Sequence, residues 1–483
     1  MYRQLAPEMW VLVMQHLPPR DQRTCLFVSS TVHTIARRFV FSDVPVTLGL
    51  WKGALVEGET QLLSKAIQDD VSRRARSSLA LLKHAANVSD FADSIKKLTL
   101  TSFALLERHA FDSGAGPPPV ATAERILTAN ADTLQRLCIS SSPETVSVLY
   151  GSDPEAFTRL EELSLIFPHT VDGLDAVFTH CTALRSLTFC VSSDNGVDEA
   201  VTEALRTYPS ALPHLTSLKL HHRTGFPRGT APAQDIADFV LGHPGLRRLD
   251  VVLGPSALAF YGGCPLMWAL PKLPALAVLG FDFYPAYLVR GLVQFLDLNL
   301  PRALSALHMY ARVGQADMST DDWAVFFEER NALRFINVVC DKAESVGLRD
   351  VLFRRPPRAL ELLGFNFGMH AVSRVPATGK PVFAEPWSWP KTFHASLDRS
   401  GSGSGGGEDG EEDWEWLLRH HGHNDKIDIA EWMLKASDDG ADPQRTGARR
   451  SNGLAEGAKL NGKNGRNGKR GGSTGDDSME TGG

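Results

Sequence analysis

Residues 215–220 read LTSLKL and residues 246–251 read LRRLDV, two copies of a six-residue pattern with apolar residues at its first, fourth and sixth places. The pattern recurs along the middle of the chain. Its copies start at Ile95, Leu134, Leu160, Leu184, Leu215, Leu246, Leu276, Leu304, Leu333 and Leu360. Successive starts lie 24 to 39 residues apart, which is room for one short strand and one returning helix. The spacing therefore predicts a repeat fold.

Each copy predicts one strand, because its last two apolar residues alternate with a variable residue, the period of a strand with one buried face. Helix-like runs such as residues 231–241 (APAQDIADFVL) and 321–330 (DDWAVFFEER) separate the copies. Strands that alternate with helices in this way must be parallel, since a parallel pair needs a crossover connection. We expect an α/β solenoid over residues 95–392, with residues 39–48 supplying an irregular first strand.

The copies resemble the leucine-rich repeat family over about residues 95–368. The resemblance implies a horseshoe in which the leucines form the core. One departure concerns the Asn that common versions carry three residues after the last apolar strand position. Other residues stand there, among them Ser142, Pro168, Arg223, Gly254, Tyr284 and Asp341.

The variable residues of the strands should point away from the leucines, onto the concave face with which solenoids usually bind. Their mixed charge and a tyrosine favour a protein client over nucleic acid, which would require a basic stripe. For any single residue the alternative is a solvated face with no ligand. The candidate client-binding residues are Lys219, His221, Arg248, Asp250, Asp282, His308, Tyr310, Asn337 and Asn366.

Residues 1–45 predict three short helices. Met9, Val13 and Leu17 recur every four residues as one apolar stripe. Asp21 can cap a second helix whose Val28 faces inward, and a third helix follows. Such a module buries little surface of its own, so a partner or the adjoining solenoid should cover it.

The same segment resembles the F-box in the order and spacing of Leu5, Glu8, Met9, Trp10, Val13, Met14, Leu17, Asp21, Val28 and Ser29. Ala6 and Val32 depart from the family pattern, and the style of the match is that of fungal members. F-box proteins bind a Skp-type adaptor, which joins them to a cullin and a RING subunit, so the resemblance implies these partners. The adaptor-binding residues that it implies are Leu5, Pro7, Met9, Val13, Leu17 and Val28. The alternative is a helical cap on the solenoid.

Residues 46–94 read as a helical linker or a first irregular repeat, with apolar residues at helical spacing from Thr60 to Phe91. Residues 393–483 are rich in Gly, Asn, Ser and charges and predict a mostly disordered tail. Within it, residues 411–436 hold two short amphipathic stretches that either dock on the solenoid or serve as a partner motif. The diluted basic residues of 445–470 favour a solvated tail over nuclear import or RNA contact.

Composition excludes several classes of protein. A net charge of −6 gives no nucleic-acid-binding field, and no apolar run is long enough to span a bilayer. Six cysteines without a CxxC pair, and no secretion signal, predict reduced thiols in the cytoplasm or nucleus. Phosphate-loop, zinc-protease, serine-hydrolase and deaminase motifs are absent, and we expect no cofactor. The dense histidines, His420, His421 and His423, are weak metal candidates.

These features lead to one main hypothesis: a non-catalytic substrate receptor of an SCF-type ubiquitin ligase, with the F-box on the adaptor and the repeat face on an unknown protein client. The alternative is a leucine-rich-repeat scaffold for protein interaction without a ligase role. An enzyme with an unrecognised site in the solenoid is the third possibility, which no group of residues supports.

Overall fold

The computed structural model describes residues 5–48, 65–102, 128–130, 132–140, 157–166, 168, 171, 173–191, 197–222, 231–252, 265–283, 290–311, 320–340, 346–366, 368–388 and 413–419. All described residues belong to one unit, Met1–Trp432.

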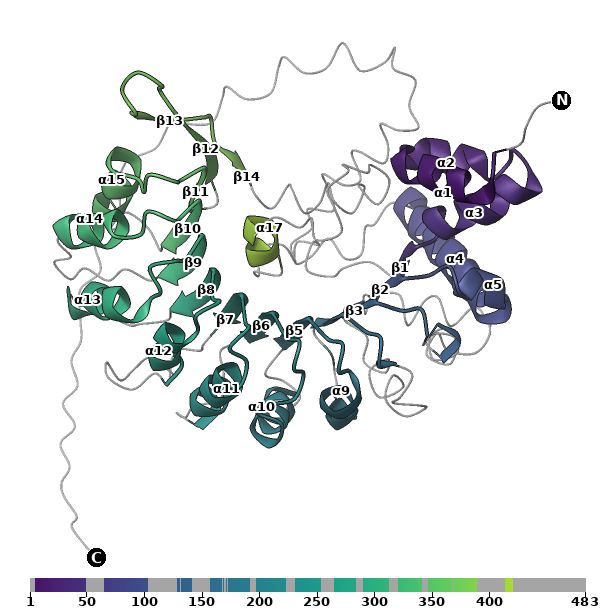
Figure 1. Cartoon of the computed structure of the whole chain (residues 1–483), viewed down its shortest axis with the longest axis horizontal. Helices are drawn as coiled ribbons and strands as arrows, with labels where there is room; N and C mark the ends of the chain where they lie inside the picture. Colours follow the sequence, from purple (N-terminus) through teal and green to yellow (C-terminus); the bar gives the residue numbers. More distant parts are fainter. Residues whose placement is uncertain are drawn as a thin grey trace, which may run out of the picture. The chain divides into compact units, whose positions relative to one another are not determined.

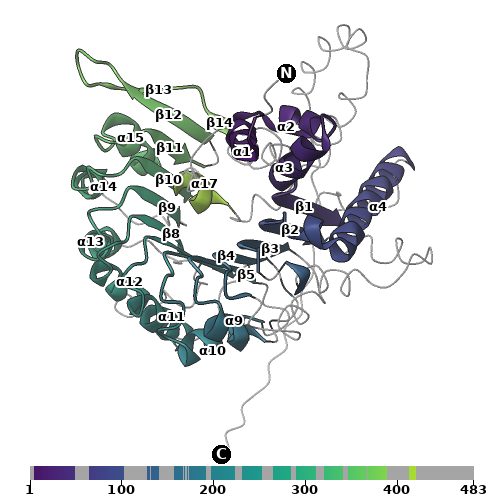
Figure 2. The same ribbon diagram turned by 45° about the vertical axis from the view of Figure 1, so that its right-hand side comes forward.

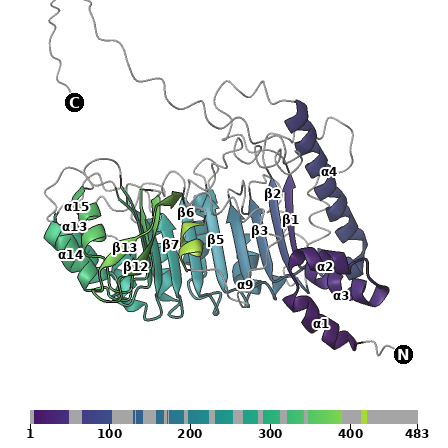
Figure 3. The ribbon, with the colours of Figure 1, turned by 90° about the horizontal axis from the view of Figure 1, so that it is seen from above.

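One sheet runs through the described part of the first unit, with its strands side by side in chain order from β1 to β13 (Figures 1 and 3). The strands are β1 (Asp43–Leu48), β2 (Lys97–Ser102), β3 (Arg136–Ser140), β4 (Glu162–Ile166), β5 (Ser186–Val191), β6 (Ser217–His222), β7 (Arg248–Val252), β8 (Val278–Phe283), β9 (Ala306–Ala311), β10 (Phe335–Cys340), β11 (Leu362–Phe365), β12 (Gly368–Arg374), β13 (Pro381–Phe383) and β14 (Trp387–Ser388).

Strands β1 to β11 pair in parallel, as the repeats predict. Each repeat copy supplies one strand from β2 to β11, which begins two residues after the copy's first apolar residue, as Ser217 follows Leu215. The strands pair without interruption from β1 to β11, although other residues replace the Asn that common leucine-rich repeats carry after each strand. At the end of the sheet β12 is antiparallel to β11, and β13 and β14 are antiparallel to β12, which the repeats did not predict.

The helices between the strands lie on one side of the sheet (Figure 1). They are α9 (Leu174–His180), α10 (Val197–Thr207), α11 (Ala231–Leu241), α12 (Pro265–Ala269) with the 3₁₀ turn η5 (Leu270–Lys272), α13 (Arg290–Asn299), α14 (Thr320–Glu328) and α15 (Val346–Arg354). The helices predicted over residues 231–241 and 321–330 are α11 and α14. No helix in the described ranges has both the length and the hydrophobicity needed to cross a membrane.

The main core lies between the sheet and these helices, and the in-register leucines of the repeats fill it. Leu218 pairs with Leu187 on one side and Leu249 on the other, and all three are fully buried. Burial of each such side chain stabilises the fold by roughly 1.5–3 kcal/mol. The residues that alternate with these leucines point to the opposite face.

The segment after the N-terminal helices belongs to the sheet. Strand β1 pairs with β2, and the helix between them, α4 (Lys65–Asn87), packs against β1. The helix expected between Thr60 and Phe91 corresponds to α4, and β1 lies within residues 39–48, which were expected to supply an irregular first strand. Extended backbone at Val88 separates α4 from a short helix α5 (Ser89–Ala92).

The N-terminal module consists of α1 (Pro7–His16), α2 (Pro19–Cys25) and α3 (Ser30–Val40), as predicted. Met14, Val32, Ile35 and Ala36 form a small core of their own. The Ser29 hydroxyl caps α3 by accepting a hydrogen bond from the Val32 N–H at 3.3 Å.

Two details of the module differ from the prediction. Pro19 already occupies the first turn of α2, so that Pro18 is its N-terminal flanking residue and Asp21 lies inside the helix. Val28 follows α2 and is 63% exposed, because Met14 and the residues of α3 fill the small core.

Candidate functional site

The sheet face opposite α9–α15, here called the open face, carries a short helix from late in the chain (Figures 1 and 2). This helix, α17 (Asp413–Leu418), belongs to the first of the two amphipathic stretches predicted within residues 411–436. It packs on β8 and β9. Of the two alternatives predicted for this stretch, docking on the solenoid is therefore the one observed. The second stretch lies outside the described residues.

A row of variable residues crosses the open face in register. Lys219 of β6 pairs with Asp250 of β7, and the row continues through Gly280, His308 and Asn337 on β8 to β10. All of them stand at the fifth place of their repeat copies. The fold therefore brings together polar side chains that lie about 30 residues apart in the sequence.

Asp250 is the centre of a buried charged cluster. Its Oδ2 lies 2.9 Å from Lys219 Nζ and 2.8 Å from His221 Nε2. The three side chains are 0%, 1% and 7% exposed, in that order. Buried charges cost desolvation energy unless they are paired, and here the Lys219 ammonium is paired with Asp250 Oδ2. Along the same row Asn337 Nδ2 donates to His308 Nδ1 at 2.9 Å.

Lys219 also binds the carboxyl end of α17. Its Nζ donates to the main-chain oxygens of Trp416 at 2.7 Å, Leu417 at 3.2 Å and Arg419 at 2.7 Å. The last carbonyl groups of a helix have no partner within the helix, and a cation also interacts favourably with their partial negative charge. Lys219, a residue of strand β6, therefore caps the carboxyl end of α17.

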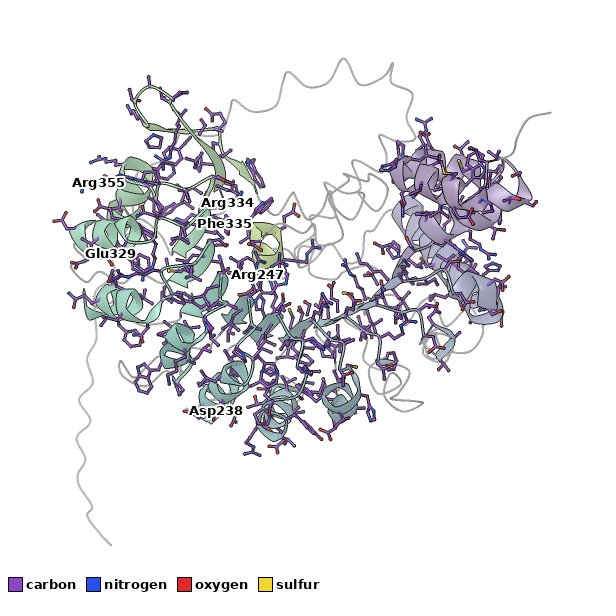
Figure 4. All side chains as sticks on the ribbon, viewed as in Figure 1. Asp238, Arg247, Glu329, Arg334, Phe335 and Arg355 are labelled. Carbon is purple, nitrogen blue, oxygen red and sulfur yellow. The ribbon has the colours of Figure 1, made fainter. Side chains whose placement is uncertain are left out.

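Two arginines hold the amino end of α17 through Asp413 (Figure 4 shows Arg247 beside the helix). Arg247 donates from Nη1 at 2.9 Å and Nη2 at 2.7 Å, one bond to each carboxylate oxygen. Arg248 Nε donates to Oδ1 at 3.0 Å. Burial raises the pKa of Asp413, but the two guanidinium groups outweigh it, so that this pKa lies below its ordinary value.

Between these ends α17 rests on an apolar floor. Trp416, Leu417 and Leu418 are buried against a cluster that includes Val278, Ala306, Phe335 and Met369. The Trp414 ring lies 5.8 Å from that of Trp387 and 6.5 Å from that of Phe335.

Trp416 and Leu417 each meet a particular feature of the sheet. The ammonium of Lys219 lies 4.6 Å, and the guanidinium of Arg248 5.7 Å, from the centre of the Trp416 ring. Gly280 leaves the space that Leu417 and Asp250 occupy, because a Cβ there would lie 2.8 Å from Leu417 Cδ1 and 2.2 Å from Asp250 Oδ1.

The predicted client-binding residues are thus mostly covered. Lys219, His221, Asp250, His308 and Asn337 are buried, so a solvated face is the wrong description of these five, because α17 or neighbouring side chains cover them. Their role in client binding stays a prediction.

The remaining four predicted client-binding residues differ in their surroundings. Arg248 is 17% exposed in its ion pair with Asp413. Asn366 is half-buried at a left-handed φ of 46°. Asp282 and Tyr310 lie on β8 and β9, and their side chains fall outside what the structure describes.

The sequence prediction missed Arg247 and Gly280 and did not anticipate which face α17 would occupy. A signal for the Lys219–Asp250 pair existed, since both residues hold the fifth place of consecutive copies and parallel stacking makes them neighbours. The opposite charges of Arg247 and Asp413 gave only a weak signal, because many other pairs of charges in the chain would fit as well.

The residues predicted to bind an adaptor are mostly at the surface of the N-terminal module. Leu5 and Met9 are each 48% exposed, Val13 is 37% exposed, and Pro7 is exposed. Val28 is exposed as well, as described above.

Leu17 differs from the other adaptor-binding candidates, since it is half-buried and packs against the module's core. Two exposed apolar residues were missed, Leu12 at 51% and Phe27 at 88%.

Two further kinds of site can be assessed in the described ranges, a metal site and a reactive cysteine. They contain no group of three His, Cys, Asp or Glu that could hold a metal ion, and the histidines at 420, 421 and 423 lie outside them. Burial raises the pKa of the Cys181 thiol to about 12, which keeps it protonated and unreactive. Neither models of known protein families nor curated protein sequences match this chain.

Proposed function

We propose that this chain is a substrate-receptor subunit of an SCF-type ubiquitin ligase. The N-terminal module binds a Skp-type adaptor, and through it a cullin and a RING subunit, while the open face of the sheet binds a protein client. No catalytic step is assigned to the chain itself. The proposed compartment is the cytoplasm or the nucleus.

The observation that carries the proposal is the exposed apolar surface of the N-terminal module. Leu5, Met9, Leu12 and Val13 lie in α1 or just before it, and Phe27 follows α2 in the same module. Large apolar side chains gathered on so small a module favour a partner that covers them. The F-box resemblance of the same residues supports a Skp-type adaptor as that partner.

The module's packing favours this proposal over a solenoid cap. A cap would bury its apolar residues against the end of the sheet. Instead, the module's core around Met14 and Ile35 is separate from the main core, which begins at Val44 of β1. Met9 and Val13 remain exposed in the described structure. They are therefore open to an external protein.

The test is a titration of purified Skp-type adaptor into the full chain, compared with Met9→Asp/Val13→Asp. We expect one-to-one binding by the wild type and a loss of at least about 100-fold in the variant, because two charges would be buried in an apolar interface. Leu17 is left unchanged, since it packs against the module's core and a charge there would destabilise the module as well as the interface.

The matched control is Leu298→Asp on α13, where the wild-type leucine is 79% exposed and lies far along the chain from the module. It should bind the adaptor as the wild type does. Circular dichroism of all three proteins checks their folding. If the folded wild type does not bind the adaptor, the ligase role is wrong and a protein-interaction scaffold remains.

A further inference from the structure

The contacts of α17 amount to a recognition site for a short helix. Its first residue, Asp413, is held by two arginines, and the main-chain oxygens at its other end are held by Lys219. Its buried residues, Trp416 to Leu418, lie on the apolar floor. A charged contact at each end and an apolar contact between them fix both the position and the direction of the helix.

The site also restricts the sequence that fits it. The first place requires an acidic side chain to pair with Arg247 and Arg248. The fourth place suits an aromatic ring, since two cations lie within 6 Å of the Trp416 ring centre. The fifth place suits leucine, because Gly280 leaves room for Leu417.

The cost of the buried charges indicates selection among ligands. If α17 were only a structural strap, apolar residues in place of Lys219 and Asp250 would cover the sheet at less desolvation cost. Buried charges that must be matched reject ligands that lack the complementary groups.

We propose that the open face binds a client through a short helix of the pattern acidic–x–x–aromatic–Leu–apolar, and that α17 is the chain's own copy of that helix, which the client displaces. The term client rests on the proposed function, whereas the site and its ligand chemistry do not. Because α17 is part of the same chain, it competes at an effective concentration on the order of millimolar. An unmodified receptor is therefore partly self-inhibited.

The probe for the test is a fluorescent peptide with the sequence of residues 409–423, titrated into full-length protein. In the variant Trp416→Ala/Leu417→Asp the internal helix loses its apolar contacts and leaves the face. We expect this released variant to bind the peptide about 10-fold or more tightly than the wild type does. Equal affinity of the two folded proteins would overturn the proposal.

A charge exchange tests the ligand chemistry directly. In the released variant, Arg247→Glu/Arg248→Glu should weaken peptide binding about 10-fold or more, and a peptide with Asp413→Arg should recover most of the loss. A general loss of structure would not be rescued by a change in the peptide. Absence of this rescue, with both proteins folded, would also overturn the proposal.

A glycine pair supplies the matched control for shape. Gly280→Ala in the released variant should weaken peptide binding, because the added Cβ takes space needed by the peptide's leucine and by Asp250 beneath it. Gly245→Ala should not, since a Cβ there meets nothing within 4 Å. If the two substitutions have equal effects, the peptide binds elsewhere.

The adaptor titration separates this proposal from the proposed function. The released variant should bind the Skp-type adaptor like the wild type. Adaptor binding without peptide binding would overturn only the present inference. Peptide binding without adaptor binding would overturn only the ligase role and leave a regulated interaction scaffold.

Discussion

Asp250 links Lys219 and His221 through a single carboxylate oxygen. Its Oδ2 contacts both Lys219 and His221, and its side chain is fully buried. The carboxylate thus compensates the Lys219 ammonium, which in turn holds α17. Loss of this one group would leave a buried cation without its counter-ion.

We predict that Asp250→Ala lowers the free energy of unfolding by about 3 kcal/mol or more, the typical cost of breaking a buried ion pair. Asp43→Ala is the control, because Asp43 forms a comparable 3.1 Å pair with Lys97 but is 45% exposed. That pair should contribute less than about 1 kcal/mol. Urea unfolding measures both changes. Similar small losses in the two variants would show that the Asp250 pair is unimportant for stability.

At the scale of elements, the repeat strands could be predicted from the sequence, whereas docking of α17 was predicted only as one alternative and without the face that it occupies. The strands follow from local spacing, since each begins two residues after a repeat's first apolar residue, from Lys97 to Leu362. Docking of α17 depends on the shape of a floor assembled from β8 to β12, which no local pattern encodes. For this reason the burial of these polar residues of the open face could not be predicted from the sequence.

The same reasoning applies within the N-terminal module. The period of four at Met9, Val13 and Leu17 correctly indicates a helix but not which residues face inward. Met14 fills the module's core, whereas Met9 and Val13 are exposed. With apolar residues on both faces of α1, only packing against α3 decides which face is buried.

The docking of α17 should depend on pH through Asp413. The arginines hold the folded-state pKa of Asp413 below its ordinary value of 3.8. The ion pair therefore contributes its full stabilisation above pH 3.8, and this contribution is lost as the pH falls through the lower, folded-state pKa.

Hydrogen exchange of the amides of residues 413–418, corrected for intrinsic rates, measures this effect. Protection in the wild type should stay constant from neutral pH down to about 4 and then decline. Asp413→Asn should be less protected at neutral pH and should lack this decline. A decline of equal size in Asp413→Asn would assign the pH dependence to another group.

At the scale of the whole described structure, the chain carries two candidate binding surfaces on separate cores. The N-terminal module is built around Met14, and the open face is a property of strands β6 to β12 with α17. Substitutions on one surface should not change binding at the other, because they share no residues. A receptor needs this separation, since it must hold adaptor and client at the same time.

Reconstituted ubiquitin transfer tests both surfaces together most directly. The substrate is a lysine-bearing carrier protein fused to the peptide of residues 409–423, and the receptor is the full chain carrying Trp416→Ala/Leu417→Asp, assembled with adaptor, cullin, RING subunit and charged enzyme. We predict ubiquitin on the carrier, and its loss when either Met9→Asp/Val13→Asp or Arg247→Glu/Arg248→Glu is added. Transfer that persists in both added variants, or no transfer by a receptor shown to bind both adaptor and peptide, would contradict the substrate-receptor role.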